Sequence, residues 1–334
     1  IVGKQPYGID YRAEVTGVKM PPHNGSGIPK TLAGTGFFKS VGNLAAKPGV
    51  IPYDVNSPLW SDGAQKFRWV ALPDRSQIGF AADGEYQWPG GTVFVKHFEL
   101  VTNEQTKAKR RLETRLLVLD PSGGNGYGVT YKWRSDESGA ELLTSGLDEQ
   151  IDVIGKDGRI RSQVWHYPSQ EECLQCHTTK SGFVLGANTR QLNSEFRYPS
   201  GRTDNQIRTW NYLQMFTSNV HEGSIEGYKR LVKLEDAGAG LEDRVRSYWD
   251  SNCAFCHRPG GTGSQWDARY DTPLIDQNSI QAAVRETYGI ADAKVVAPGD
   301  LPKSIMHLRM ISSQATQRMP PVGRNVVDTT AVNA

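Results

Sequence analysis

Cysteine is scarce in this chain of 334 residues, which contains only four. All four lie inside two short segments, residues 173–177 and 253–257. No cysteine remains to cross-link other parts of the chain, so a small scaffold held together by several structural disulfides is excluded. Whatever chemistry the thiols perform is confined to these two segments.

Long apolar runs and a strong excess of charge of one sign are missing as well. No stretch approaches the roughly 18 consecutive apolar residues that a membrane span requires, so we expect no transmembrane segment. The formal net charge is +2, which gives no reason to expect nucleic-acid binding. The chain begins at Ile1 without the charged and apolar regions of a signal peptide. We therefore interpret it as a mature product whose precursor carried an export signal.

Glycine and proline are plentiful by contrast, with 35 and 18 residues. Prolines recur between residues 6 and 58 and preclude a long helix there. Alternating or continuous apolar patterns then predict antiparallel strands at residues 92–101, 111–119, 128–133, 150–154 and 161–165. Apolar residues at helical spacing predict helices further along the chain, at residues 205–216, 225–233, 241–250 and 301–312.

Each cysteine pair is followed directly by a histidine, in the pattern Cys-x-x-Cys-His. In this pattern the two thiols add to the vinyl groups of a porphyrin, and the histidine reaches the iron as its proximal ligand. The sequence therefore predicts two covalently attached haem c groups. The expected cofactor-binding residues are Cys173, Cys176, His177, Cys253, Cys256 and His257.

A zinc site, a redox dithiol and ordinary disulfides are the alternative uses of paired cysteines. The pairs of a zinc ribbon are usually about 15–20 residues apart, whereas a much longer stretch separates Cys176 from Cys253. A redox dithiol normally belongs to a βαβ unit, and no such unit is predicted here. Only 7 of the 334 residues are histidine, so a histidine after both pairs rarely arises by chance.

The second haem has a clear candidate for its sixth ligand. Met319 lies downstream of His257, and the two prolines that follow it stiffen the loop that would hold the thioether at the iron. Met306 and Met310 are rivals, but their spacing within an expected helix favours core packing. A His/Met pair raises the reduction potential relative to two histidines, which suits an electron relay.

The first haem has several candidates for its sixth ligand. His166 is the first, because it lies seven residues before Cys173 and this length of chain can reach round the ring. Met215, which lies within an expected helix, is the next. The remaining histidines outside the motifs are His23, His97, His221 and His307. Without a protein ligand on this side, the iron would be open to a substrate.

Together these elements predict an α+β fold, with an N-terminal antiparallel β module followed by two helical c-type cytochrome segments, the second class-I-like. The expected divisions are a loop and β module at residues 1–165, a first haem segment at 166–235 and a second haem domain at 236–334. A small cytochrome domain normally closes with a helix after its methionine loop. Because the sequence ends at Ala334, we expect a very short helix, an incomplete chain end or a neighbouring chain that covers the gap.

Several segments, taken in order, resemble a family of bacterial exported c-type cytochromes that carry an N-terminal β module. They are residues 28–32, 35–38 and 51–64 (Ile-Pro-Tyr-Asp-Val-Asn-Ser-Pro-Leu-Trp-Ser-Asp-Gly-Ala), 165–177, 185–186, 191–193, 318–321 and 325–328. The resemblance covers nearly the whole chain. It implies the domain order and two haems, but no established substrate. Some members of that family are fused to quinoprotein sugar-dehydrogenase-like domains, so a quinoprotein dehydrogenase is one expected partner.

Electron transfer between exported redox proteins is the leading functional hypothesis. Haem is attached to such motifs outside the cytoplasmic membrane, so we expect a periplasmic or extracellular protein. One alternative is a haem enzyme, peroxidase-like or acting on another small molecule, with the first haem as its active site. Another is a cytochrome subunit or assembly element of a larger redox complex.

A dense polar group beside Trp60 is the remaining candidate site. Its members, Asp54, Asn56, Ser61 and Asp62, could bind a cation through their oxygens or form a small ligand pocket. A tight loop held by local hydrogen bonds from these side chains explains the same composition, and we favour that interpretation.

Overall fold

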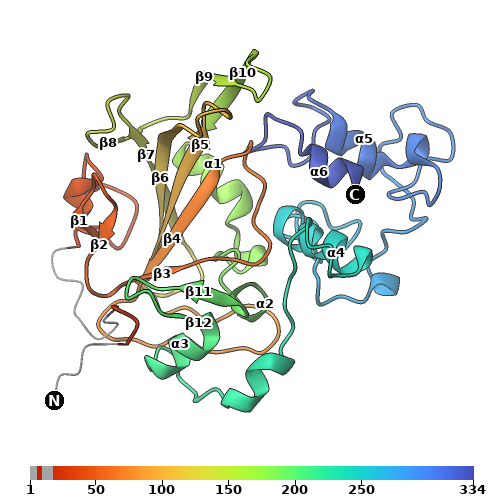
Figure 1. The fold of residues 1–334 in the computed structure, drawn as a ribbon. Coiled ribbons are helices and arrows are strands. Elements are labelled where there is room, and N and C mark those ends of the chain that lie inside the picture. Colours follow the sequence, from red (N-terminus) through yellow and green to blue (C-terminus); the bar gives the residue numbers. More distant parts are fainter. Residues whose placement is uncertain (1–5, 10–17) are drawn as a thin grey trace.

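The computed structural model describes residues 6–9 and 18–334. Its centre is an antiparallel sheet of six strands in the order β3-β4-β5-β6-β7-β8 (Figure 1). The strands are β3 (Val50–Tyr53), β4 (Gln65–Ala71), β5 (Val93–Val101), β6 (Lys109–Leu119), β7 (Gly126–Trp133) and β8 (Ala140–Leu142). Strands that follow one another along the chain are neighbours in the sheet, so the sheet is a simple meander.

Both faces of the sheet are buried, which explains why its central strands carry nearly continuous apolar runs. On β6, Leu116 and Leu117 point to opposite faces and belong to two different hydrophobic cores. The core that contains Leu117 also takes in Phe183 and Trp210, which follow the first cysteine motif in the chain. The segment after this motif therefore covers one face of the sheet.

Three two-stranded hairpins accompany the main sheet. They are β1 (Phe38–Ser40) with β2 (Ala45–Ala46), β9 (Leu147–Ile154) with β10 (Ile160–Tyr167), and β11 (Glu195–Arg197) with β12 (Thr203–Asn205). The longest of them, β9–β10, packs Trp165 and Tyr167 against Phe98 of the main sheet. Its second strand leads directly into the first motif.

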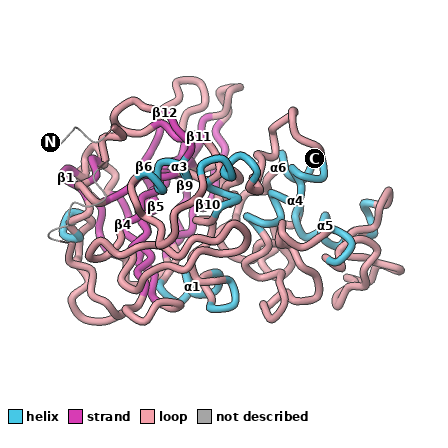
Figure 2. Tube along the Cα trace, turned by 90° about the horizontal axis from the view of Figure 1, so that it is seen from below, coloured by secondary structure: helices cyan, strands magenta, loops and turns pink. Residues whose placement is uncertain are grey.

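The helices are short. They are α1 (Gln170–Cys176), α2 (Thr189–Leu192), α3 (Gln206–Tyr212), α4 (Leu241–Asn252), α5 (Ile305–Ile311) and α6 (Thr329–Asn333). Two views at right angles place α4, α5 and α6 together, beside the part of the chain that contains the sheet (Figures 1 and 2). This outer part has a separate apolar core, which includes Trp249, Trp266 and Val295. No described helix is both long and apolar enough to span a membrane.

The expected fold class is wrong. Strands account for 25% of the structure and helices for only 19%, and two helical cytochrome segments are not evident in the described chain. Residues 166–235 contain three short helices together with the β11–β12 hairpin. Residues 236–334 have one helix of 12 residues and are otherwise mostly turns and loops. Frequent glycine and proline explain the difference, because both residues disfavour helix interiors.

Individual elements were predicted with mixed success. The five expected strands correspond to β5, β6, β7, β9 and β10, and the helix expected at residues 241–250 is α4. The helix expected at 225–233 is absent, because only a short 3₁₀ turn, Glu222–Gly227, forms there. The helix expected at 301–312 is split into a 3₁₀ turn and α5. The predicted division at residue 165 falls within β10.

Candidate functional site

The first motif lies on α1, which starts immediately after β10. Ser169 caps this helix, because its hydroxyl accepts from the Glu172 amide while the Glu172 carboxylate accepts from the Ser169 amide. This reciprocal capping satisfies amides that the first turn would otherwise leave unpaired. The helix therefore begins at a defined residue, which fixes where Cys173 and Cys176 lie.

Cys173 packs directly against the sheet at Gly128 of β7. A Cβ atom at residue 128 would lie 2.7 Å from the Cys173 Cβ and 2.8 Å from its sulfur. Only glycine leaves room for the cysteine here. The first motif is thus held against a strand of the main sheet.

His177 follows α1 and has one of its ring nitrogens engaged. Its Nδ1 lies 2.7 Å from the carbonyl oxygen of Phe183, to which it donates in the Nδ1–H tautomer. That tautomer leaves the lone pair of Nε2 available to a metal. Burial lowers the pKa of His177 to about 4, so the ring is neutral at physiological pH. A neutral imidazole is the form that binds iron.

The second motif repeats this arrangement. It begins where α4 ends, at Cys253, and the Nδ1 of His257 lies 2.9 Å from the carbonyl oxygen of Gly263. In both motifs the acceptor is the carbonyl six residues after the histidine. A Cβ atom at Gly263 would lie only 2.5 Å from that Nδ1, so glycine is required at the acceptor. Burial lowers the pKa of His257 as well.

The two motifs lie close together although they are far apart in the sequence. Burial raises the pKa of the Cys176 thiol to about 12, and the proximity of Cys256 contributes to the shift. Directly after the motifs, Arg258 Nη1 donates to the carbonyl oxygen of Lys180 at 3.2 Å. The segments that contain the motifs are therefore packed together.

A cavity adjoins each motif. The first has a volume of about 210 Å³ and is lined by Cys173, Cys176 and His177. The second has a volume of about 240 Å³ and is lined by Cys253, Cys256 and His257. Phe255 and Pro320 line both cavities. A single layer of side chains therefore separates the two sites.

Met319 lies where the sequence predicts a sixth ligand of the second haem, in the lining of the second cavity. Its loop is fixed through the backbone, because the Met319 amide donates to the Arg309 carbonyl and Arg324 donates to the Met319 carbonyl. Met306 and Met310 line the same cavity, and Met306 also packs against the apolar core that includes Trp249, as the sequence predicts. The structure thus brings three thioethers to the second site.

His166 lines the first cavity, but neither of its ring nitrogens is free. Its Nδ1 lies 2.6 Å from Asp148 and its Nε2 lies 2.9 Å from Glu172. Partial burial lowers its pKa, but the hydrogen bonds to these carboxylates outweigh this effect and raise it overall. A protonated imidazole held between two carboxylates has no lone pair for a metal. This geometry counts against the sequence prediction of His166 as a ligand.

The other candidates for the first site lie elsewhere. Met215 is fully buried in the apolar core beneath the sheet and does not line the cavity. His97 lies on the face of β5 that points away from this cavity, where its Nδ1 contacts the hydroxyl of Thr114. His23, His221 and His307 are also absent from the described lining of this cavity.

A row of three cations lies on the sheet where the first cavity meets it. Arg68 of β4 is the cross-strand partner of Lys96 on β5, and Lys96 is the partner of Arg115 on β6. All three line the cavity. Like charges opposite one another destabilise a sheet, but two of the three are compensated by carboxylates, because Arg68 pairs with Asp54 and Arg115 pairs with Glu113. Sequence reasoning missed the row, because the register of neighbouring strands creates it.

The polar group at residues 54–62 joins distant parts of the chain. The Asp62 carboxylate accepts from the amides of Asn325 and Val326, each at 2.8 Å. Trp60 donates from its amide to the Asn252 side chain at 2.7 Å. The favoured sequence interpretation, a locally bonded loop, missed these long-range contacts. The segment holds the second motif and the methionine loop against the β module.

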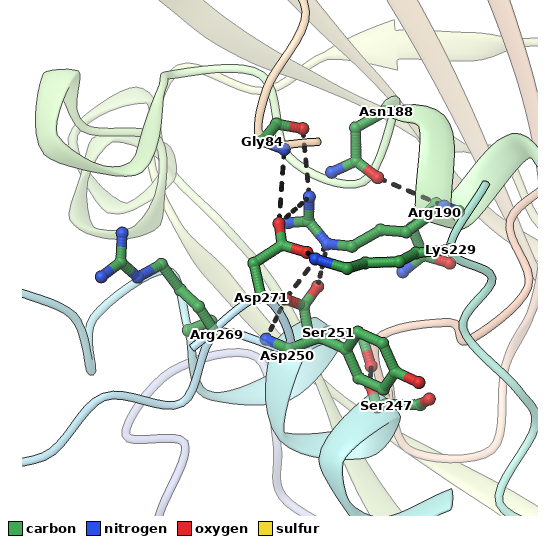
Figure 3. A network of polar contacts seen from close by, with 12 residues as sticks. Gly84, Asn188, Arg190, Lys229, Ser247, Asp250, Ser251, Arg269 and Asp271 are labelled. Atoms are coloured by element: carbon green, nitrogen blue, oxygen red, sulfur yellow. Dashed lines mark hydrogen bonds and ion pairs between the residues drawn. The ribbon is translucent and has the colours of Figure 1, made fainter. Parts of the chain in front are cut away.

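A buried ion-pair network makes a second connection (Figure 3). Arg190 of α2 contacts Glu85 at 2.9 Å, Asp250 of α4 at 3.2 Å and Asp271 at 3.4 Å. Asp271 also pairs with Lys229 at the rim of the network. Because Asp250 lies three residues before Cys253, this network fixes the end of α4 relative to the first site.

The donor set fits haem better than its rivals. All four cysteines are free, so neither pair forms a disulfide. In the described chain no three side chains of His, Cys, Asp or Glu converge in a way that could hold a metal ion. A structural zinc needs four such ligands, whereas haem iron receives four from the porphyrin and needs only one or two from the protein. Two thiols, a neutral imidazole and a cavity match that requirement at each motif.

Comparisons with protein-family models, with curated proteins and with solved structures found no match to this chain.

Proposed function

We propose that the chain is a dihaem c-type cytochrome that transfers electrons between exported redox partners. The observation that carries the proposal is the adjacency of two equivalent motifs, each with free thiols and an available imidazole nitrogen beside a cavity. Two redox centres separated by a single layer of side chains suit a relay. A protein that holds one substrate at one centre has no need of this arrangement.

Bound haem would supply the one-electron chemistry. The chain's own residues attach and orient it. Cys173 and Cys253 are fixed by Gly128 and by the end of α4, and the carbonyls of Phe183 and Gly263 select the histidine tautomer. Phe255 is buried and lines both cavities, so its apolar ring lies between the two sites.

The proposed partners are periplasmic or extracellular redox proteins, a quinoprotein dehydrogenase or a larger redox complex among them. This location follows from the haem proposal, because such groups are attached outside the cytoplasmic membrane. A charged interface that guides such a partner would make the rate of electron exchange fall with ionic strength. Stopped-flow reduction of the oxidised protein at several salt concentrations measures this dependence.

The pyridine haemochrome assay tests the cofactor content. The chain is produced with an export signal in a bacterium that attaches haem c, and haem is counted per chain. We expect two haems in the wild type and one in each of two double variants, Cys173→Ala/Cys176→Ala and Cys253→Ala/Cys256→Ala. A reductive titration should then take up two electrons per wild-type chain. Exported protein that contains no haem would refute the proposal.

The rival hypothesis of a haem enzyme has one observation in its favour. Within the described chain, no methionine and no unengaged histidine other than His177 lines the first cavity. Carbon monoxide binding to the reduced protein, or steady turnover of peroxide, would support this rival over a simple relay. Inert, low-spin iron at both sites would eliminate it.

A further inference from the structure

Asp62 reaches from the β module to the residues that directly follow the methionine loop (residues 318–324). Its buried carboxylate accepts from the amides of Asn325 and Val326, each at 2.8 Å. The Trp60 indole donates to the Val326 carbonyl at 2.9 Å, and the Asn325 side chain donates to the Val164 carbonyl of β10 at 3.1 Å. The β module therefore holds the end of the loop through both amides and a carbonyl of the backbone.

Arg324 links these residues to the methionines. It is buried, and its guanidinium donates to the carbonyls of Met310 at 2.6 Å and of Met319 at 3.1 Å. It also donates to the carbonyl of Ser312, just after α5. Met310 and Met319 both line the second cavity, so one cation fixes the backbone of two of its three thioether residues. Because Arg324 immediately precedes Asn325, the anchor at Asp62 also restrains this cation.

The charges of Asp62 and Arg324 are complementary. In the described chain the guanidinium of Arg324 donates to carbonyl oxygens, which carry no full charge. A buried cation without a nearby counter-charge is unfavourable. Burial raises the pKa of the Asp62 carboxyl, and the charges of Arg318 and Arg324 oppose this shift. The carboxylate is therefore close enough to both cations to stabilise them in the loop.

We propose that Asp62 and Arg324 are positioning residues for the methionine ligand of the second haem, a role that rests on the proposed dihaem function. Neither side chain lines either cavity, so both act through the backbone that they hold. A loop that is already ordered at the cavity loses little conformational freedom when its thioether binds iron. The β module thereby controls how firmly the sixth ligand is held.

Competition with imidazole tests this role in the oxidised holoprotein. Imidazole can bind the second iron only after the methionine has left it, so the apparent affinity reports how firmly the thioether is held. The variant is Asp62→Asn, because asparagine tolerates the left-handed backbone at this residue (φ 49°) but lacks the charge and one acceptor oxygen. A hydrogen bond to a charged group contributes enough for the second haem to bind imidazole about tenfold to a hundredfold more tightly in this variant. The double variant Cys253→Ala/Cys256→Ala identifies the signal of the second haem.

Asp204→Asn is the matched control. Asp204 is also buried and accepts from a backbone amide, that of Asn205 at 2.8 Å, but it lines neither cavity. A general loss of stability would affect both variants alike, whereas the positioning role requires tighter imidazole binding in Asp62→Asn only. Unchanged affinity in Asp62→Asn, or an equal rise in both variants, would overturn the positioning role and leave the dihaem function intact.

A second measurement uses the wild-type holoprotein and serves if Asp62→Asn does not fold. Hydrogen exchange of the peptide that contains Asn325 and Val326 is followed by mass spectrometry, with and without saturating imidazole. The amides that donate to Asp62 should be protected until the thioether leaves and the loop is released, so imidazole should accelerate their exchange. Unchanged protection while imidazole occupies the second haem would overturn the positioning role. Protein that contains no haem would instead refute the dihaem function, and the positioning role with it.

Discussion

Arg258 Nη1 donates a hydrogen bond to the carbonyl oxygen of Lys180 at 3.2 Å, joining the segment after the second motif to the segment after the first. Arg258 is buried, and burial lowers its pKa. Its Nε also donates to the carbonyl of Ala254, inside the second motif. One side chain therefore connects the second motif to the segment that follows the first, so this contact contributes to the relative position of the motifs.

Gly128→Ala should disturb the first site selectively. The added Cβ would meet the Cβ of Cys173 at 2.7 Å, so α1 must move away from β7. Overpacking of this kind costs about 1–3 kcal/mol of folding free energy. We expect a lower free energy of unfolding in urea and incomplete haem attachment at the first motif. Gly227→Ala is the control, because nothing lies within 4 Å of the Cβ atom that alanine would add there. Equal effects of both variants would contradict the packing argument.

Gly263→Ala should disturb the second site in turn. The new Cβ would lie 2.5 Å from Nδ1 of His257 and would displace the ring from its carbonyl acceptor. We expect a change in the spin state or potential of the second haem only, together with a loss of roughly 1–3 kcal/mol in stability. Electron paramagnetic resonance of the oxidised protein separates the two haems. An altered first haem with an unaltered second one would disprove the assignment.

The parts of the structure that were predictable from sequence are those that depend on local patterns. Strand periodicity located β5, β6 and β7 to within about three residues, a margin typical of element boundaries. The histidine of each motif is adjacent to its cysteines in the chain, so each candidate site could be recognised as a unit. Neither prediction required knowledge of the tertiary structure.

The missed features depend on contacts between distant segments. The position of Lys96 between Arg68 and Arg115 follows from the register of three strands, which a single sequence does not reveal. The carboxylates around His166 come from β9 and α1. A single sequence therefore does not reveal that both ring nitrogens of His166 are hydrogen-bonded. The expected helical segments were wrong because apolar spacing alone indicated helices where turns and 3₁₀ segments form.

Arg190→Met should strongly destabilise the connection between the two sites. The substitution leaves the buried Asp250 and the partly buried Glu85 without their common cation, and breaking a buried pair in this way typically costs about 3–5 kcal/mol. The free energy of unfolding in urea measures the loss. Lys229→Met is the matched control, because this half-exposed lysine belongs to the same network but pairs at its rim, where a pair contributes about 0–1 kcal/mol. If Arg190→Met lowered the free energy of unfolding as little as the control does, the network would not stabilise the connection between the two sites.

His166→Gln should change how stability depends on pH. The folded protein raises the pKa of His166 above its usual value of about 6.5, so protonation stabilises the folded state. This contribution is fully present below about pH 6.5 and is lost as the pH rises through the folded pKa. The stability difference between wild type and variant should therefore shrink as the pH rises above about 6.5. Urea unfolding at a series of pH values below and above about 6.5 measures this stability difference. The substitution His221→Gln, at an exposed histidine, is the control. A difference that grows with pH would contradict the assigned charge state.

Met319→His should lower the reduction potential of the second haem while keeping its iron low-spin. Replacing a thioether by an imidazole removes the ligand that favours the reduced state, so we expect a drop on the order of 0.1 V within the range of about 0.8 V that axial ligands cover. Met319→Ala should instead give high-spin iron at this site. Met306→Ala and Met310→Ala are the controls, because both thioethers line the same cavity. Spectroscopically monitored redox titration follows each haem. If Met306→Ala or Met310→Ala produced the high-spin signal and Met319→Ala did not, the ligand would be the methionine whose substitution produced the signal.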